Sequence, residues 1–106
     1  MNKDTSTETL IQELGCTTAP RITPSDIDDS IKDTAFYVFP DTLLTICCLT
    51  LQNGFNITGE SACASPANFN KQIGEKVAYD NARQKIWVLL GYALKDKLYA
   101  QSNETN

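Results

Sequence analysis

Three side chains in the carboxyl-terminal part of the chain could together hold an anionic ligand. Lys76, Arg83 and Trp87 are spaced so that they lie within about 40° of one another on an α-helix. An indole ring can stack on a base while neighbouring cations bind phosphate. The simpler interpretation is that Trp87 belongs to the core and that Arg83 extends to the surface and pairs with Asp80. The sequence leaves both interpretations open.

Three further polar side chains are candidates for ligand contacts. Asn81 and Tyr92 belong to the same helical region, where each could instead complete the packing with a hydrogen bond. Glu60 lies in a segment almost without charges, so its carboxylate is a candidate ligand-binding or acid–base group. The alternative is that Glu60 faces solvent or pairs with a lysine of the helical region.

The residue types available for catalysis are few. The 106 residues contain no histidine, which excludes Ser-His-Asp and Cys-His nucleophiles and mixed Cys/His zinc sites. Ser61, Cys63 and Ser65 are neighbours, but they have no general base and no glycine-rich nucleophile elbow. We therefore expect a protein that is not an enzyme and that has neither a metal nor a cofactor.

The four cysteines, Cys16, Cys47, Cys48 and Cys63, form no CxxC pair. Adjacent residues of a strand point to opposite faces, so Cys47 and Cys48 cannot serve one metal ion from regular structure. The expected state is free, mostly buried thiols in a reducing compartment, with a disulfide or redox role as the alternative.

Charge is distributed unevenly along the chain. The formal net charge is −4, which argues against broad, non-specific binding of nucleic acid. Residues 1–33 carry seven acidic and three basic groups, whereas residues 71–98 carry six basic and three acidic groups. The acidic amino-terminal segment, residues 1–33 (the acidic front half), is a second candidate interaction surface, in this case for a protein. Its candidate contact residues are Asp26, Asp28, Asp29 and Asp33.

Two short helices are expected before the sheet. Residues 7–14 can form an amphipathic helix that ends at Gly15, and residues 16–22 then form a linker. A second helix is expected over residues 23–32, because Thr23 is a good N-cap and Pro24 suits the first helical position.

The middle of the chain predicts an antiparallel meander with strands at 34–39, 43–52 and 55–62. Asn53-Gly54 is the dipeptide of a two-residue type I′ hairpin, so paired residue numbers should sum to 107. This register predicts Glu60 opposite Cys47. It also predicts a core face composed of Leu44, Ile46, Cys48 and Thr50 with Phe55, Ile57, Gly59, Ser61 and Cys63.

The rest of the chain is predicted to be helical from Ser65-Pro66, an N-cap and N1 pair. A wide apolar stripe comprises Tyr79, Ala82, Ile86, Leu89, Leu90 and Ala93. Gly74 and Gly91 interrupt the pattern, each as a cap, a kink or a point of close backbone approach. The tail 101–106 is polar, and we expect it to fray.

Several short motifs recur here in a fixed order: NGF at 53–55, TGESAC at 58–63, SPANF at 65–69, IGxK at 73–76, and the set of Trp87, Leu89, Gly91 and Tyr92. With them, residues 19–98 resemble a family of small bacteriophage and prophage proteins, the gene product 49 (phage N-four) / gene 66 (phage Sf-six) family. The resemblance implies phage origin and expression inside a bacterium, and it implies no established activity.

The chain departs from the family's pattern at two places. The family tends to have a basic residue where Glu75 stands. It often has proline near Val88, so residues 71–98 could be one helix or two.

Together these observations predict an α+β fold, a small antiparallel meander packed against a long carboxyl-terminal helix or helical hairpin, with a short helix before the sheet. Residues 1–22 would be an appendage and linker, 23–98 a single domain and 99–106 a polar tail. The expected function is a homo-oligomeric phage accessory protein that binds a small anionic, nucleotide-like ligand and so sequesters a host immune signal. The alternative is an inhibitor of a host enzyme. The start of the chain has no signal-peptide pattern and no membrane span is expected, so the expected location is the host cytoplasm.

Overall fold

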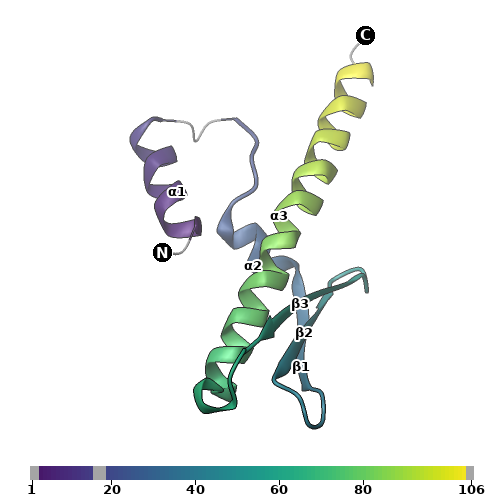
Figure 1. The fold of residues 1–106 in the computed structure, drawn as a ribbon. Helices are drawn as coiled ribbons and strands as arrows, with labels where there is room; N and C mark the ends of the chain where they lie inside the picture. Colours follow the sequence, from purple (N-terminus) through teal and green to yellow (C-terminus); the bar gives the residue numbers. More distant parts are fainter. Residues whose placement is uncertain (1–2, 16–18, 105–106) are drawn as a thin grey trace.

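The computed structural model describes residues 3–15 and 19–104. The elements in chain order are α1 (Lys3–Glu13), α2 (Pro24–Ser30), β1 (Ile31–Val38), β2 (Leu44–Leu51), β3 (Asn56–Ala62), the 3-10 helix η1 (Pro66–Asn68) and α3 (Lys71–Glu104). The three strands form one antiparallel sheet in the order β1-β2-β3, and α3 packs across one of its faces (Figure 1). The predicted α+β fold is confirmed.

Local signals place the two short helices. Thr23 caps α2: its Oγ1 accepts the amide of Asp26 at 3.2 Å, and the Asp26 carboxylate accepts the Thr23 amide at 2.9 Å. This capping box satisfies two backbone donors that the helix itself leaves unpaired. The first helix, α1, begins at residue 3, four residues before the expected start, and its Glu8 carboxylate forms a two-pronged ion pair with Arg21.

The predicted hairpin register is wrong by one residue. Paired numbers of β2 and β3 sum to 106, as in Cys47 with Gly59 and Ile46 with Glu60. Within the described residues, Gly54 takes a positive φ of 90° and Asn53 does not, so the turn is not type I′. Instead the Asn53 side chain accepts the Phe55 amide at 3.0 Å, and the ladder resumes where the Leu51 amide donates to Phe55 O. The loop therefore has three residues, with glycine in the left-handed position.

The corrected register also corrects the core face. A slip of one residue moves every side chain of a strand to the other face of the sheet. On β2 the buried residues are Thr45, Cys47, Leu49 and Leu51, not the set that begins with Leu44. These residues lie opposite Ile57, Gly59 and Ser61 of β3. The observed register thus places Leu49 of β2 opposite Ile57 of β3 on the face under α3, whereas paired numbers that sum to 107 would place these two residues on opposite faces.

The contact between α3 and the sheet depends on small residues. Ala78, Ala82 and Ile86 are completely buried, and they follow one another at intervals of four along the same face of the helix. A Cβ atom added to Gly59 would lie 2.7 Å from Ala82 Cα and still closer to the backbone of Ala78. Gly59 and the two alanines therefore let the helix backbone approach the strand directly.

The helical region differs from the expectation at both ends. Ser65-Pro66 opens only the short η1, and α3 begins at Lys71, where Asn70 Oδ1 accepts the Ile73 amide at 3.1 Å. From there α3 is one continuous helix to Glu104 and not a helical hairpin, and it includes residues 101–104 of the polar tail. Of the predicted stripe, Ala82 and Ile86 are buried, whereas Leu89 and Ala93 are exposed.

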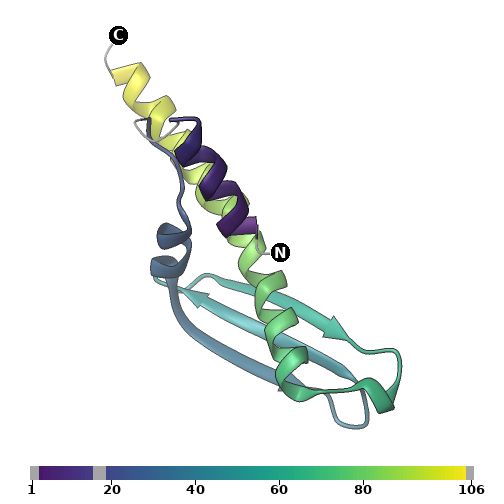
Figure 2. The same ribbon diagram turned by 90° about the vertical axis from the view of Figure 1, so that its left-hand side faces the viewer.

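The second half of α3 extends beyond the sheet. A helix of 34 residues is about 51 Å long, and the molecule measures 60 × 33 × 19 Å. We call residues 88–104 the arm; it projects past the strands in both ribbon views (Figures 1 and 2). Val88, Tyr92 and Tyr99 on the arm are 63–75% exposed, and their spacing places them within about 40° of one another around the helix.

Candidate functional site

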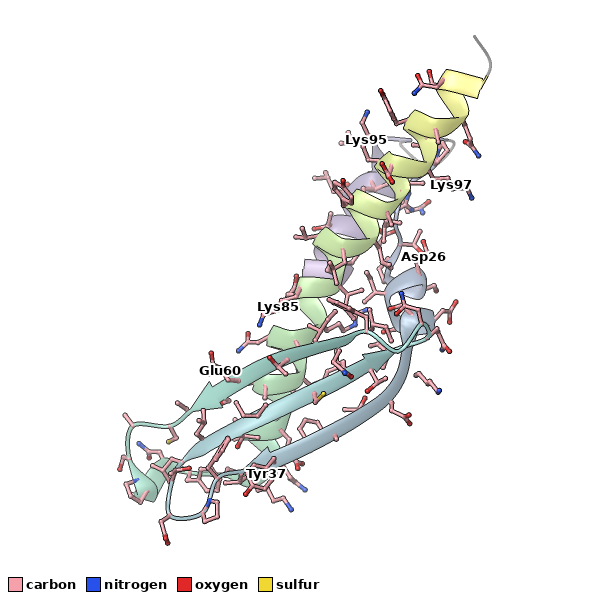
Figure 3. All side chains as sticks on the ribbon, turned by 90° about the vertical axis from the view of Figure 1, so that its right-hand side faces the viewer. Asp26, Tyr37, Glu60, Lys85, Lys95 and Lys97 are labelled. Atoms are coloured by element: carbon pink, nitrogen blue, oxygen red, sulfur yellow. The ribbon has the colours of Figure 1, made fainter. Side chains whose placement is uncertain are left out.

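The structure does not bring the six sequence-predicted site residues together. Five of them lie along α3, and Glu60 lies on β3 (Figure 3).

Arg83 connects two elements of the fold. Its side chain is buried to 9% exposure. Its Nε donates to Asp28 Oδ1 at 3.1 Å, and an Nη donates to Pro24 O at 3.3 Å. Arg83 therefore holds α2 against α3. The predicted pairing of Arg83 with Asp80 is wrong, since Asp80 pairs with Lys76. The pairing with Asp28 could not be read from helical spacing, because the two residues are 55 positions apart.

Lys76 and Trp87 are also engaged within the chain. The Lys76 ammonium pairs with Asp80 at 2.7 Å on the helix surface. Trp87 is partly buried and packs against the core cluster. The line Lys76/Arg83/Trp87 therefore consists of a surface ion pair, a helix-to-helix clamp and a core contact.

Asn81 and Glu60 meet at the free edge of β3, but through the backbone of Glu60. The Asn81 amide donates to Glu60 O at 2.8 Å, one helical turn before Lys85, whose ammonium donates to Thr58 O at 2.5 Å. The Glu60 side chain is exposed on the sheet face away from α3, opposite Ile46 and not Cys47. Tyr92 lies on the arm, 74% exposed.

A surface that the sequence reasoning did not identify lies between the start of β3 and α3. This hollow has a volume of about 420 Å³, and we call it the β3 hollow. Its lining is mainly apolar, with one cation: Phe55, Asn56, Ile57, Thr58, Lys85, Val88 and Leu89. The volume falls in the range of small-molecule sites, about 300–1,000 Å³.

Lys85 gives the β3 hollow its charge. Among the described residues, no carboxylate lies within ion-pair distance of Lys85, whereas Lys76 and Arg83 both have one. An ammonium has three donors, and within the described residues one of them is used, on Thr58 O. Phe55 lines the same hollow and is 55% exposed. Helical spacing alone could not predict that Lys85 and Phe55 line one hollow, because this depends on how α3 crosses β3. The NGF motif was the available signal for Phe55.

The described cysteines are free thiols. Cys47 is completely buried and Cys48 lies on the other face of the sheet, as the alternation predicts. Burial, and secondarily the neighbouring Cys48, raises the pKa of Cys47 to about 11. Cys16 lies outside the described residues. Within the described part of the chain, no three metal-ligating side chains gather in one place, and no helix has the length and apolar character of a membrane span.

Comparison with known proteins agrees with the motifs. No curated protein and no solved structure matches the chain. The family described as Phage protein (N4 Gp49/phage Sf6 gene 66) matches residues 22–98, which include the whole sheet and most of α3. The chain therefore belongs to the N4 Gp49/phage Sf6 gene 66 family of phage proteins.

Proposed function

We propose that this phage protein binds a small anionic, nucleotide-like ligand in the β3 hollow without transforming it. The observation that carries the proposal is that Lys85, a cation without an ion-pair partner in the described residues, lines the same hollow as the exposed Phe55. Sequestration of a nucleotide signal of the host's defence is the use that we propose for this binding.

The chemistry of the β3 hollow suits such a ligand in two ways. Phe55 provides an aromatic face, and stacking on an aromatic ring contributes about 1–3 kcal/mol per base. The two remaining donors of Lys85 can form charge-assisted hydrogen bonds with a phosphate, which are about twice as strong as neutral ones. The line Lys76/Arg83/Trp87 is a less suitable ligand site, because Arg83 would have to give up its hydrogen bonds to Asp28 and Pro24 O to reach a ligand.

A ligand in the β3 hollow also favours an oligomer. Val88 and Leu89, which line one side, are exposed apolar residues on α3. Small-molecule sites usually enclose 70–90% of their ligand, and an open hollow on one chain does not. We propose that a second copy closes the site along the exposed side of α3.

Thermal melting with a panel of linear and cyclic nucleotides tests the ligand proposal. A nucleotide at 100 times its dissociation constant should stabilise the fold by about 2.7 kcal/mol. Lys85→Glu should abolish the shift, whereas Lys97→Glu, on the arm and outside the β3 hollow, should keep it.

Two results would contradict this assignment. If Lys76→Glu abolishes the shift and Lys85→Glu does not, the ligand uses the line on α3 that spacing suggested. If no nucleotide moves the melting temperature of the wild type, nucleotide binding itself is refuted.

A second candidate function, an inhibitor of a host enzyme, is favoured by the arm. Val88, Tyr92 and Tyr99 form an exposed stripe on one side of it, and tyrosine is enriched in protein interfaces. The acidic front half is less available than its sequence suggests, since Asp28 binds Arg83 and Asp26 belongs to the capping box. Asp29 and Asp33 remain exposed.

Affinity capture from host lysate distinguishes this second function. It predicts a stoichiometric host protein that the wild type retains and that a Tyr92→Glu, Tyr99→Glu double variant loses. An Asp29→Asn, Asp33→Asn variant tests the acidic surface in parallel. Recovery of no partner by the wild type would count against inhibition of an enzyme.

A further inference from the structure

The two edge strands of the sheet, β1 and β3, differ in whether other parts of the chain cover them. At the β3 edge, side chains from α3 satisfy the outward carbonyls of Thr58 and Glu60: Lys85 donates to the first and Asn81 to the second. Such side chains prevent another strand from adding to an edge. At the β1 edge, no element of the described chain covers the strand, and residues 32–37 are all exposed.

The register identifies which backbone groups of β1 face outward. The Leu51 amide donates to Phe55 O, so the odd-numbered residues of β2 bond to β3 and its even-numbered residues bond to β1. Cys48 and Ile46 pair with Ala35 and Tyr37. The residues between these two partners and on either side of them, Thr34, Phe36 and Val38, therefore direct their N–H and C=O groups away from the sheet.

The exposed strand is short, uncharged and bounded at both ends. Residues 34–39 read TAFYVF, a run of high β-propensity with no charge, which is the kind of edge that pairs with another strand. A β-bulge between Ile31 and Asp33 ends the regular edge on one side. Pro40, which has no amide hydrogen, ends it on the other side. About six residues are thus available for pairing.

This strand fits a second copy of itself. An antiparallel pair with its two-fold axis at Phe36 places Phe36 opposite Phe36 and Thr34 opposite Val38. In that register the outward groups of all three residues face each other, and each pair exchanges two N–H···O bonds. On the other face, Tyr37 lies opposite Ala35, so a large ring meets a small side chain. Tyr37 already stacks edge-on against Phe39 of its own chain, with ring centroids 4.9 Å apart.

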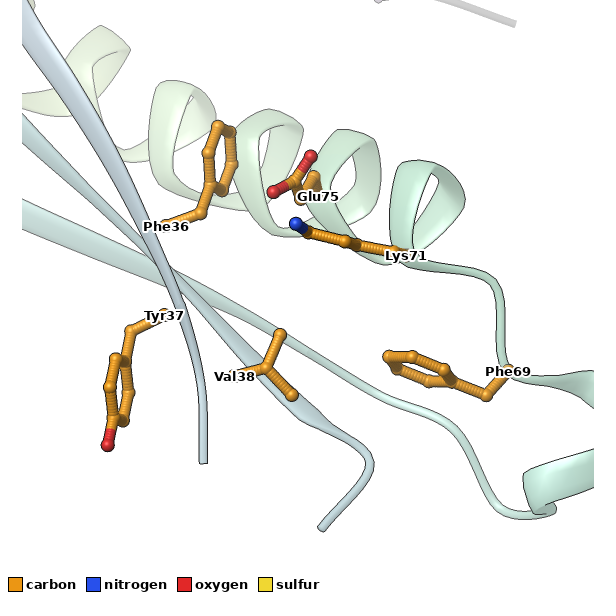
Figure 4. Close-up of a pocket in the computed structure, with 6 residues that line it drawn as sticks. All are labelled: Phe36, Tyr37, Val38, Phe69, Lys71 and Glu75. Atoms are coloured by element: carbon orange, nitrogen blue, oxygen red, sulfur yellow. The ribbon is translucent and has the colours of Figure 1, made fainter. Parts of the chain in front are cut away.

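The exposed edge of β1 borders a groove. It has a volume of about 410 Å³ and lies between β1 and the start of α3 (Figure 4). Phe36, Val38 and Phe69 form its apolar surface, and Lys71 and Glu75 bring one charge of each sign from α3. An isologous contact uses the same patch on both copies, so Phe36 and Val38, which line the groove, would lie at the contact in each copy.

We propose that two copies of this chain join β1 to β1 about Phe36 and form a continuous six-stranded antiparallel sheet. Both α3 helices then lie on the same face of that sheet. Because Asn81 and Lys85 block the β3 edges, the pairing closes at two copies and does not extend into a fibre. The inference rests on residues outside the β3 hollow, so it can fail or succeed independently of the proposed ligand.

A charge-swap experiment tests this register. Phe36→Lys should halve the mass of the oligomer in sedimentation, because two like charges would meet directly across the axis. Phe36→Glu should do the same. An equimolar mixture of the two variants should restore the wild-type mass, since lysine then faces glutamate. Ala62→Lys, an exposed residue on the opposite edge strand β3, is the matched control and should leave the mass unchanged.

Hydrogen exchange of the unmodified protein gives a second measurement that does not depend on the folding of a variant. The amides of Thr34, Phe36 and Val38 should become protected as the protein concentration rises. Fast exchange of all three at every concentration would overturn the proposal. So would a wild type that is monomeric up to millimolar concentration, a mass unchanged by Phe36→Lys, or folded variants that fail to recombine.

Discussion

The crossing of α3 over Gly59 predicts that a single added methyl group destabilises the fold. In Gly59→Ala the new Cβ would lie 2.7 Å from Ala82 Cα, whereas carbon atoms in contact prefer about 3.5–4.0 Å. Helix and strand must therefore separate by about 1 Å where they cross. The obstructing atoms include the backbone of Ala78 and Ala82, so no rotamer change can relieve the contact.

The magnitude follows from two opposing effects. Overpacking of a core costs about 1–3 kcal/mol, and a clash with backbone belongs at the upper end. Alanine regains about 0.5–1 kcal/mol over glycine inside a strand. The net loss should be about 2 kcal/mol of the free energy of unfolding, which corresponds to about 10 °C in the melting temperature of a domain of this size.

Urea denaturation followed by circular dichroism measures this effect, with Gly91→Ala as the matched control. Gly91 lies in α3, where an added Cβ would have no atom of the described residues within 4 Å. That substitution should stabilise the protein by up to about 1 kcal/mol, because alanine is the better helix former. The two glycine-to-alanine changes should thus have opposite signs. If Gly59→Ala is as stable as the wild type, the close crossing of α3 over β3 is refuted.

Three further predictions concern buried groups. Thr45→Val should stabilise the fold by about 1 kcal/mol in the same assay, because Thr45 Oγ1 is buried without a hydrogen-bond partner in the described chain. Arg83→Leu should cost about 1–3 kcal/mol by releasing α2, and Asp28→Asn should cost less because Asp28 is mostly exposed. Cys47 should resist alkylation at pH 8 until the protein unfolds. Its pKa rises from 9.0 to about 11 on folding, so the unfolded thiol loses its proton at a lower pH than the folded one. The free energy of unfolding should therefore fall between pH 9 and 11.

The β2–β3 hairpin shows which features of a turn the local sequence predicts and which it does not. Asn53-Gly54 correctly indicated a turn between two strands, and Gly54 does adopt a positive φ. The dipeptide is compatible with both a two-residue and a three-residue loop, and these differ by one residue in register. The choice depends on which side chains of β2 and β3 share the face under α3, and no local signal contains that information.

The candidate site illustrates the same limit for charged residues. Helical spacing placed Lys76, Arg83 and Trp87 on one side of α3, and α3 is indeed a continuous helix there. Spacing could not indicate that Asp28, on another helix, binds Arg83. It also could not indicate that Lys85, which the helical wheel did not single out, lines the same hollow as Phe55.

The sequence by itself determined the α+β class, the capped α2, the three strands and the membership of a phage protein family. Caps, turns and alternation act over a few residues, and family motifs are order and spacing along the chain, so one dimension suffices for them. Only the tertiary structure decided the register of β3, the partner of Arg83, the hollow at Lys85 and the open edge of β1. Each of these depends on how α3 lies across the sheet, and that placement is set by packing between residues distant in the chain, above all Gly59 against Ala78 and Ala82.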